Sequence, residues 1–501
     1  MATTLHWAEK SEFFRGAQEE FEAMVAWLTS NEAPISLDEL ERGIHTRGQK
    51  TMLKLWQAHL DCLSARERAQ APSPPAGVEV RAHTRQVEGR FGRGQLRRLG
   101  YKAPGERVRF PLDALLNLPA DLYSHSVREC MAWEAQRGSW DQAIENVERT
   151  TAAHVPKRQA EQIVTRAAQD FDAFYDERPQ TANDAQSTTS LLALSSDSTS
   201  VRVRFESLRD ATRKQAEAAA QQSVRGDPIK AKPLRNHDKR MAVATAVWEQ
   251  EPQVRTAEQI VENFKRGQAR SRSKHKWSSL PKPQNKRVSA TIEKDQTMAI
   301  EKMFQEAARR DPTRTRTAIA LVDGERRQIE AIEQQARHFG FAVTIVLDII
   351  HVLHYLWGAG MAMCCNKERE AEKWVATYLL KVLTRPALDV VAGIRQAATK
   401  RGLTRKQGKP VEKCARYLLN NAPYIRYNEF LARGFPIATG VIEGCCRYLV
   451  HDRLDITGAQ WNLESAEAVL RLRALRASGD WTEYWSYHLR CESMRNYQAA
   501  A

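Results

Sequence analysis

The sequence has no long hydrophobic run and no cysteine spacing typical of a zinc site. No stretch reaches the roughly 18 consecutive uncharged apolar residues of a membrane-spanning helix. The N-terminal residues 1–6 lack the basic and then apolar order of a signal peptide. Eight cysteines include the adjacent pairs Cys364–Cys365 and Cys445–Cys446 but no Cys-x-x-Cys. We therefore expect a cytoplasmic protein without a membrane partner, whose cysteines are reduced and structural.

Charge of one sign is in excess. The chain carries 76 Lys and Arg against 61 Asp and Glu, so its formal net charge is +15. Such a charge suits a polyanionic partner, and the affinity for that partner should fall as salt rises. The 501 residues suffice for three or more domains. We therefore expect a multidomain protein that works on nucleic acid.

Three acidic residues occupy places where a carboxylate has no packing role. Asp197 follows the apolar run 191–194, Asp323 directly follows the run 318–322, and Glu443 lies near the start of a helical pattern. Aliphatic runs of this length are typical of strands buried on both faces, so the two Asp should lie at or near strand ends. Neighbouring carboxylates repel one another unless cations lie between them. Two divalent metal ions held by three carboxylates and acting on a phosphodiester are the simplest chemistry for such a cluster.

The N-terminal part of the chain reads as three segments. Residues 8–69 carry apolar side chains at helical spacing, and the Pro-rich stretch 71–77 interrupts them, because proline removes a backbone donor and fixes φ. The predicted segments are a helical module at 1–70, a linker with a short β-like, Arg-rich segment at 71–119, and a helical region at 120–185.

The end of that helical region has the order of a helix-turn-helix. A helix from Trp140 is followed by a break at 154–156, and a second helix begins with Lys157, Arg158 and Gln159. Pro156 suits the first turn of this second helix. Basic and amide side chains there could reach base edges and phosphates in a major groove. The alternative is an ordinary helical hairpin with a solvated charged face.

Residues 190–357 change to an α/β pattern. A strand cluster, a helix, a strand, a helix and a strand is the order of an RNase H-like fold. In that order Asp197, Asp323 and Glu443 occupy the three places of the metal-binding carboxylates. The predicted elements are strands at 191–205 and 240–248, a helix at 292–310, a strand at 317–322, a helix at 326–339 closed by Gly340, and a strand at 341–347.

Four segments, in one order, resemble the signatures of bacterial insertion-sequence DDE transposases of the ISKra type. The resemblance runs from about residue 105 to the C-terminus. It implies a mainly helical multidomain protein with a central α/β RNase H-like core at 190–357, a helical insertion at 358–435, and C-terminal helices of the core at 436–501. The four segments are Leu321–Glu325, Asp348–Trp357, Thr439–Gly444 and Asp452–Trp461.

The resemblance also implies an activity. Such a transposase binds the terminal inverted repeats of its element as double-stranded DNA, cuts the strand ends and transfers them to target DNA. Two magnesium ions, for which manganese can substitute, would be held by Asp197, Asp323 and Glu443. One active site holds one scissile phosphate, so joining two ends requires a homodimer or a larger assembly. We expect the protein in the bacterial cytoplasm, associated with the nucleoid.

Asp348 competes with Asp323 for the second catalytic place. Asp348 and His351 lie on one helical turn, where the carboxylate could orient the imidazole or both could contact DNA. In related superfamilies an Asp or Cys, two residues and a His follow the second catalytic Asp, which favours Asp323 as the ligand. For each Asp the alternative is a helix N-cap.

Other basic and aromatic residues are candidates for DNA contacts. The predicted loop Lys265–Arg287 holds nine Lys or Arg and no acid, so it could follow a phosphate backbone or form a solvated insertion. Arg447 and Arg453 could hold a phosphate or form surface salt bridges. Trp461 could brace an unstacked base or belong to the core. The candidates in the basic stretch are Arg270, Arg272, Lys274 and Lys276.

The chain departs from the family pattern after the first Asp. Members usually have Gly there, whereas Asp197 is followed by Ser198. The change leaves the ligand in place but alters the turn behind it. It motivates a rival hypothesis, that of a transposase-derived regulator that binds inverted repeats without cutting them.

Overall fold

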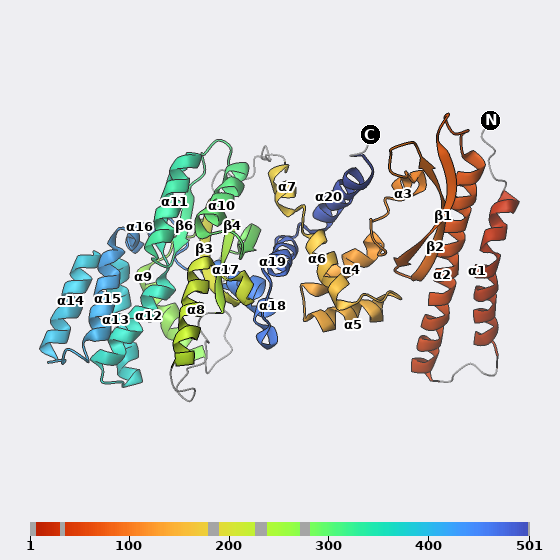
Figure 1. Ribbon diagram of the computed structural model, residues 1–501. Helices are drawn as coiled ribbons and strands as arrows, with labels where there is room; N and C mark the ends of the chain where they lie inside the picture. The colour runs from red at the N-terminus through yellow and green to blue at the C-terminus, as the bar shows by residue number, and fades with distance from the viewer. Residues whose placement is uncertain (1–6, 31–35, 179–189, 226–237, 271–280, 499–501) are drawn as a thin grey trace. The chain divides into compact units, whose positions relative to one another are not determined.

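The protein consists of two compact units. The computed structural model describes residues 7–30, 36–178, 190–225, 238–270 and 281–498 (Figure 1). Residues Met1–Asp176 and Asp480–Ala501 form one unit, here the terminal unit, and Glu177–Gly479 form the other, the central unit. The sequence assigned 436–501 to one segment, but the structure separates its end at Asp480. The last helix belongs to the other unit because its charged side chains form buried ion pairs with residues of the N-terminal part of the chain.

Charge pairs hold that last helix, α20 (Trp481–Ser493), in the terminal unit. Glu492 pairs with the buried Arg128 at 3.3 Å, and the buried His488 ring contacts Asp170 at 2.6 Å. Partners more than 300 residues apart in sequence close this unit. The other helices here are α3 (Pro111–Leu115), α4 (His125–Ala135), α5 (Trp140–Thr150), α6 (Lys157–Ala167), α7 (Phe171–Asp176) and the π-helical turn Met494–Gln498.

The terminal unit begins with a helical pair and a two-stranded sheet. Helix α1 (Trp7–Leu28) packs against α2 (Leu37–Gln70), which covers the hairpin of β1 (Glu79–Gly89) and β2 (Gly92–Lys102). The Gln57 side chain exchanges two 2.8 Å hydrogen bonds with the backbone of Gln95, and Glu67 accepts the Leu99 N–H. Helix α2 therefore satisfies backbone groups of β2 that an edge strand would leave open.

A five-stranded mixed sheet forms the centre of the central unit (Figure 1). Its strands run in the order β5-β4-β3-β6-β7. Strand β4 is antiparallel to both of its neighbours, β3 and β5, whereas β3, β6 and β7 are parallel to one another. Every residue of β6 is buried, as expected for an aliphatic strand covered on both faces. The strands are β3 (Leu191–Arg202), β4 (Lys239–Gln250), β5 (Gln284–Thr291), β6 (Ala318–Val322) and β7 (Val343–Leu347).

Helices make up most of the rest of the central unit. They are α8 (Asp210–Arg225), α9 (Ala257–Arg270), α10 (Gln296–Arg310), α11 (Arg326–Phe339), α12 (Ile349–Met363), α13 (Glu368–Thr384), α14 (Ala387–Lys400), α15 (Lys409–Asn420), α16 (Tyr427–Ala432), α17 (Gly440–Cys445), α18 (Asp452–Leu454) and α19 (Leu463–Ser478). Short 3-10 turns lie at Phe205–Ser207, Ala422–Tyr424 and Ile456–Gly458, and a π-helical segment at Cys446–His451.

The expectation of a mainly helical, multidomain chain with an α/β centre is confirmed. Helix α11 ends at Gly340, whose φ of 72° is the left-handed cap conformation that glycine favours. The basic stretch Lys265–Arg287 was wrongly read as one loop, because its ends belong to α9 and β5. Among the described residues, no helix combines the length and hydropathy that crossing a membrane requires.

Candidate active site

Strand register brings three aspartates to one level of the sheet. The parallel pairing of β3 with β6 ends at Ser195 opposite Leu321, and two residues further along lie Asp197 and Asp323. The pairing of β6 with β7 ends at Val322 opposite Leu347, and the next residues are Asp323 and Asp348. Three neighbouring strands therefore each carry an Asp just beyond their parallel pairing, where open α/β sheets bind ligands.

The position of Asp197 corrects one expectation. This residue is not at the end of its strand, because β3 continues to Arg202 and Asp197 pairs with Ala244 of β4. It lies instead where the parallel neighbour β6 has ended. The antiparallel pairing with β4 keeps the backbone of Asp197 extended. Within the residues that the structure describes, the opposite edge of β3 has no strand partner at this position, because its pairing with β6 ends at Ser195.

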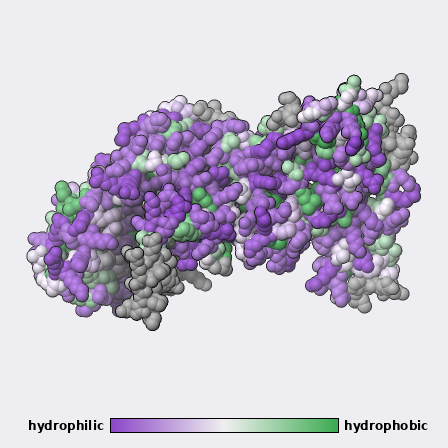
Figure 2. Space-filling model, in the orientation of Figure 1, coloured by the Kyte–Doolittle hydropathy of each residue, from purple (hydrophilic) through white to green (hydrophobic). Residues whose placement is uncertain are grey.

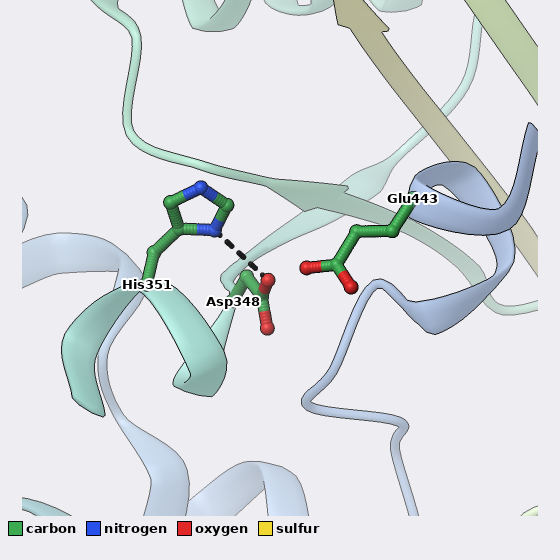
Figure 3. A group of neighbouring side chains, drawn as sticks. All are labelled: Asp348, His351 and Glu443. Atoms are coloured by element: carbon green, nitrogen blue, oxygen red, sulfur yellow. Dashed lines mark hydrogen bonds and ion pairs between the residues drawn. The ribbon is translucent and has the colours of Figure 1, made fainter. Parts of the chain in front are cut away.

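Glu443 completes the group from a helix. It lies in the first turn of α17, whose N-cap is Thr439. Potential ligand atoms of Asp348, His351 and Glu443 all lie within 4.8 Å of one another. Figure 3 shows the three side chains converging, two from the start of α12 and one from α17. Asp197, Asp323, Asp348 and Glu443 are called the carboxylate group below.

Asp348 is fully buried and hydrogen-bonded through both oxygens. Its Oδ1 accepts the Ile350 N–H at 2.9 Å, so Asp348 is the N-cap of α12. Its Oδ2 contacts His351 Nδ1 at 3.0 Å and accepts the Thr439 hydroxyl at 2.6 Å. Asp348 therefore caps a helix and orients His351 at the same time, the two roles that the sequence left as alternatives to metal binding.

Mutual repulsion and burial raise proton affinities in the site. Burial is the main cause that raises the pKa of Asp197 and of Glu443, and each of these residues is also affected by the charge of another member of the carboxylate group. The hydrogen bond that His351 makes to the Asp348 carboxylate raises the pKa of His351, as do the charges of Asp323 and Glu443. Carboxylates in this state gain from any cation placed among them.

Two further contacts hold Asp197. The Ser198 N–H donates to its Oδ1 at 2.7 Å, and the Cys446 thiol lies 3.5 Å from its Oδ2. Cys446 opens the π-helical segment that follows Glu443, and such segments often occur at functional sites. Farther along this segment, His451 Nε2 contacts the Thr199 hydroxyl at 2.7 Å. The segment thus joins β3 to the helix that carries Glu443.

Asp323 is held through both its side chain and its backbone. Its Oδ1 accepts the Glu325 N–H at 2.9 Å, and its carbonyl accepts the Tyr417 hydroxyl at 2.6 Å. Gly324 follows with a φ of +95°, a conformation that favours glycine. Asp323 is not an N-cap, since Glu325 occupies that place on α11. Asp323 is not among the three residues, Asp348, His351 and Glu443, whose potential ligand atoms lie within 4.8 Å of one another. Both Asp323 and Asp348 therefore stay candidates for the second ligand.

The donor set decides which cations fit. Oxygen ligands alone, from Asp197, Asp323 and Glu443, suit magnesium or manganese, whereas an imidazole shifts the preference toward softer transition metals. His351 Nδ1 faces Asp348, so in this rotamer the same nitrogen cannot keep that hydrogen bond and bind a metal. The other ring nitrogen, Nε2, is the one that could still bind a metal ion while Nδ1 keeps its hydrogen bond.

Two of the three downstream candidates have structural roles. Trp461 is buried, and its indole donates to the Leu454 carbonyl at 3.0 Å, so it cannot brace an unstacked base. Arg453 is buried beneath the same ring, and its charge centre lies 4.6 Å from the ring centroid. Burial lowers the pKa of Arg453 to about 10. Arg447 is different, because its side chain is 81% exposed and forms an ion pair with Asp452 at 3.7 Å, the surface salt bridge that was the alternative to phosphate binding.

Three of the proposed DNA-binding residues belong to α6 of the terminal unit. Lys157, Arg158 and Gln159 are exposed on the first turn of α6, and Lys157 pairs with Asp141 of α5 at 2.9 Å. Pro156 is the N-cap of α6 and not part of its first turn. Arg270 is the last residue of α9. Arg272, Lys274 and Lys276 lie outside the described residues.

Sequence patterns did not identify the residues that support the site. Thr439, Tyr417 and Cys446 each contact a member of the carboxylate group from more than 90 residues away in the chain. Only Thr439 had a signal, because it begins one of the segments that carry the family resemblance. No protein-family model matches the chain, and no curated protein matches it significantly.

Proposed function

We propose that the protein is a DNA transposase that cuts and joins strands by metal-dependent phosphoryl transfer. The observation that carries this proposal is the alignment of Asp197, Asp323 and Asp348 at one level of the sheet, opposite Glu443. Four carboxylates placed together destabilise an apo-protein, so their arrangement calls for a cationic ligand. Phosphodiester cleavage with divalent metal ions is the reaction that uses such a cluster most directly.

The topology of the central unit supports an RNase H-like core. The first three strands form an antiparallel meander, and the next two join the edge of β3 in parallel. The first Asp lies on β3, the next follows β6, and the glutamate comes from a later helix. In the chain, the segment 358–435 lies between the last of these Asp residues and Glu443. It contains helices α13 to α16 and fits the expected insertion.

The side chains divide the work in this proposal. Asp197, Glu443 and one of Asp323 and Asp348 would hold the cations, which activate a water or a 3′-hydroxyl and stabilise charge on the phosphate. His351, oriented by Asp348, lies where a donor could contact a phosphate oxygen or the DNA backbone. Exposed Arg447 can bind a flanking phosphate.

The deciding experiment is a nicking assay. Duplexes carrying the inverted repeats from the DNA that flanks the gene are incubated with the protein and magnesium, or with a chelator. Strand cleavage at the repeat end, dependent on magnesium or manganese, is expected. Tight binding of these duplexes without cleavage under any divalent ion would contradict an enzymatic role.

A second candidate, an inactive DNA-binding regulator, rests on Ser198. Ser198 lies within β3 opposite Val243, so no turn follows Asp197, and the N–H that Ser198 donates to Asp197 Oδ1 is a backbone group that glycine would also supply. Ser198→Gly would restore the usual family residue. A wild-type protein that does not cut, beside a Ser198→Gly variant that does, would favour the regulator.

A further inference from the structure

The first two helices leave an apolar face uncovered. Of the fourteen large hydrophobic residues that are exposed in the described part of the chain, six belong to α1 and α2. Most of the surface visible in Figure 2 is hydrophilic, so this concentration is unusual. Five of the six, here the apolar face, are Phe21, Val25, Ile44, Met52 and Leu55.

Helix α2 is divided into three sectors. One faces α1, where Gly43 lies against Trp27 and Lys54 pairs with Glu20. A second faces the β-hairpin through residues such as Gln57 and Leu60. The third would be solvated in a monomer and should then be polar. Instead it carries Ile44, Met52 and Leu55.

Helix α1 continues the same face. Successive residues turn by about 100° around a helix, so Phe21 and Val25 fall beside the row of buried Ala17 and share one side. The contacts Trp27–Gly43 and Glu20–Lys54 show that α1 and α2 are antiparallel. On each helix, the exposed apolar residues are reached from the α1–α2 contact by turning in the same sense, viewed from that helix's N-terminus. Because the two helices are antiparallel, these two rows of residues lie on the same side of the helical pair. Both helices therefore contribute to one continuous apolar face.

We propose that this face is the interface between two copies of the chain, which associate as a four-helix bundle. Helix α1 has 22 residues and is about 33 Å long. The pair of helices in one copy presents a face of roughly 33 Å by 20 Å, or about 650 Å². Two copies would therefore bury about 1,300 Å² in total, which is within the range of stable protein interfaces. The exposed Phe21, 52% accessible, and Leu55, 44% accessible, would be the central anchors.

This inference does not depend on the proposed function. It concerns association without DNA and uses only residues of the terminal unit. A second copy is the occupant that it names, because self-association places the same apolar surface on both partners. If the protein is also a transposase, the interface would supply the two active sites that joining two DNA ends requires.

Light scattering coupled to gel filtration, on the full-length protein without DNA, tests the proposal. The wild type is expected at twice the chain mass of 57.0 kDa, and Phe21→Glu with Leu55→Glu at the chain mass itself. Ile44→Glu serves as an independent single variant. All changed side chains are exposed, and matching circular dichroism spectra and melting temperatures would show that the fold is kept.

Leu388→Glu is the matched control. Leu388 is 69% exposed on α14 of the helical insertion, the other segment that could supply a dimer contact. This variant should remain dimeric. A monomeric wild type, or a dimer that resists the changes on the apolar face, would overturn the proposal. So would a dimer that dissociates only with Leu388→Glu.

Discussion

At the scale of single residues, Asp348 has three tasks. Its two oxygens cap α12, orient His351 and accept the Thr439 hydroxyl. With three hydrogen bonds already made, this carboxylate has less remaining capacity for a metal than Asp197, whose contacts are one N–H and one distant thiol. A residue so fully satisfied is suited to fixing geometry.

Neutral substitutions at the carboxylates should separate ligation from positioning. We predict that Asp197→Asn, Asp323→Asn and Glu443→Gln each lower the strand-cleavage rate by about a hundredfold or more, because each removes a charge that would hold the proposed cations. Duplex binding should stay within a few-fold of wild type. A gel assay of cleavage and binding measures both.

Asp348→Asn is the control for those variants. It keeps the shape and part of the hydrogen bonding, so a smaller loss is expected, together with a lower melting temperature. Should Asp348→Asn lose cleavage completely while Asp323→Asn retains it, Asp348 is the second ligand.

The raised pKa values predict how stability depends on pH. Burial raises the pKa of Asp197 and Glu443 above their ordinary values of 3.8 and 4.5, so the folded state binds more protons than the unfolded state just above these values. The free energy of unfolding then falls as pH rises through that window. The raised pKa of His351 has the same sign at higher pH, because its stabilisation is present below 6.5 and lost above.

Thermal melting without divalent cations, over a pH series, measures this effect. The double variant Asp197→Asn with Glu443→Gln should show a shallower loss of stability with rising pH than the wild type, and magnesium should flatten the wild-type curve. If stability falls with pH at the same rate in the wild type and in the double variant, Asp197 and Glu443 are not the cause of the pH dependence.

At the scale of elements, the helical insertion supports the strand ends. Tyr417 of α15 donates to the Asp323 carbonyl at 2.6 Å, and Tyr427 of α16 donates to the Leu347 carbonyl at 2.9 Å. The Tyr417 ring also stacks on Tyr355 of α12 at 3.9 Å. The insertion therefore holds the backbone at Asp323 and immediately before Asp348, so it helps set the spacing of the carboxylate group.

Tyr417→Phe tests this support. Loss of one hydrogen bond should lower the free energy of unfolding by about 1 kcal/mol, and a less fixed Asp323 should weaken manganese binding by about tenfold. Calorimetric titration with manganese measures the second effect. Tyr424→Phe is the control, since its hydroxyl contacts Glu333 at 3.4 Å and no strand-end backbone group. Equal manganese affinities in both variants would mean that Tyr417 only stabilises the fold.

Substitutions on helix α6 test the hypothesis that its first turn binds DNA. Replacing Lys157 and Arg158 with Ala should weaken binding to terminal-repeat DNA and reduce the slope of log affinity against log salt by about two, one for each phosphate that the variant no longer binds. Arg15→Ala on α1, whose charge is paired with Glu12, should leave the slope unchanged. Unaltered affinity and slope in the double variant would mean that α6 does not contact DNA.

At the scale of the whole molecule, sequence predicted the local elements better than the assembly. Strand β6 and the glycine end of α11 followed from hydrophobic runs and cap chemistry, which act within a few residues. Strand β5 was missed because its charged first residues resemble a loop, while its later residues are buried by partners distant in sequence. The Thr439 contact to Asp348 spans 91 residues, and no local pattern encodes it.

Glu492 should be critical for the terminal unit. Glu492→Ala would leave Arg128 buried beside an empty partner position, and breaking such a pair costs about 3–5 kcal/mol. Arg128 keeps a second partner in Asp121 at 2.6 Å, so the lower end of that range is expected. Chemical denaturation of the full chain measures it. A change no larger than that of Glu483→Ala, on the same helix, would contradict the prediction.

The return of α20 to the terminal unit has a consequence during synthesis. The ribosome makes the N-terminal partners of α20 first, then the whole central unit, and only after it the helix that pairs with Arg128 and Asp170. Nascent chains should therefore complete the central unit before the terminal one, although domains generally mature from the N-terminus. A message broken just after the codons of the central unit would yield chains with an intact carboxylate group and an unfinished terminal unit, which proteases should remove first.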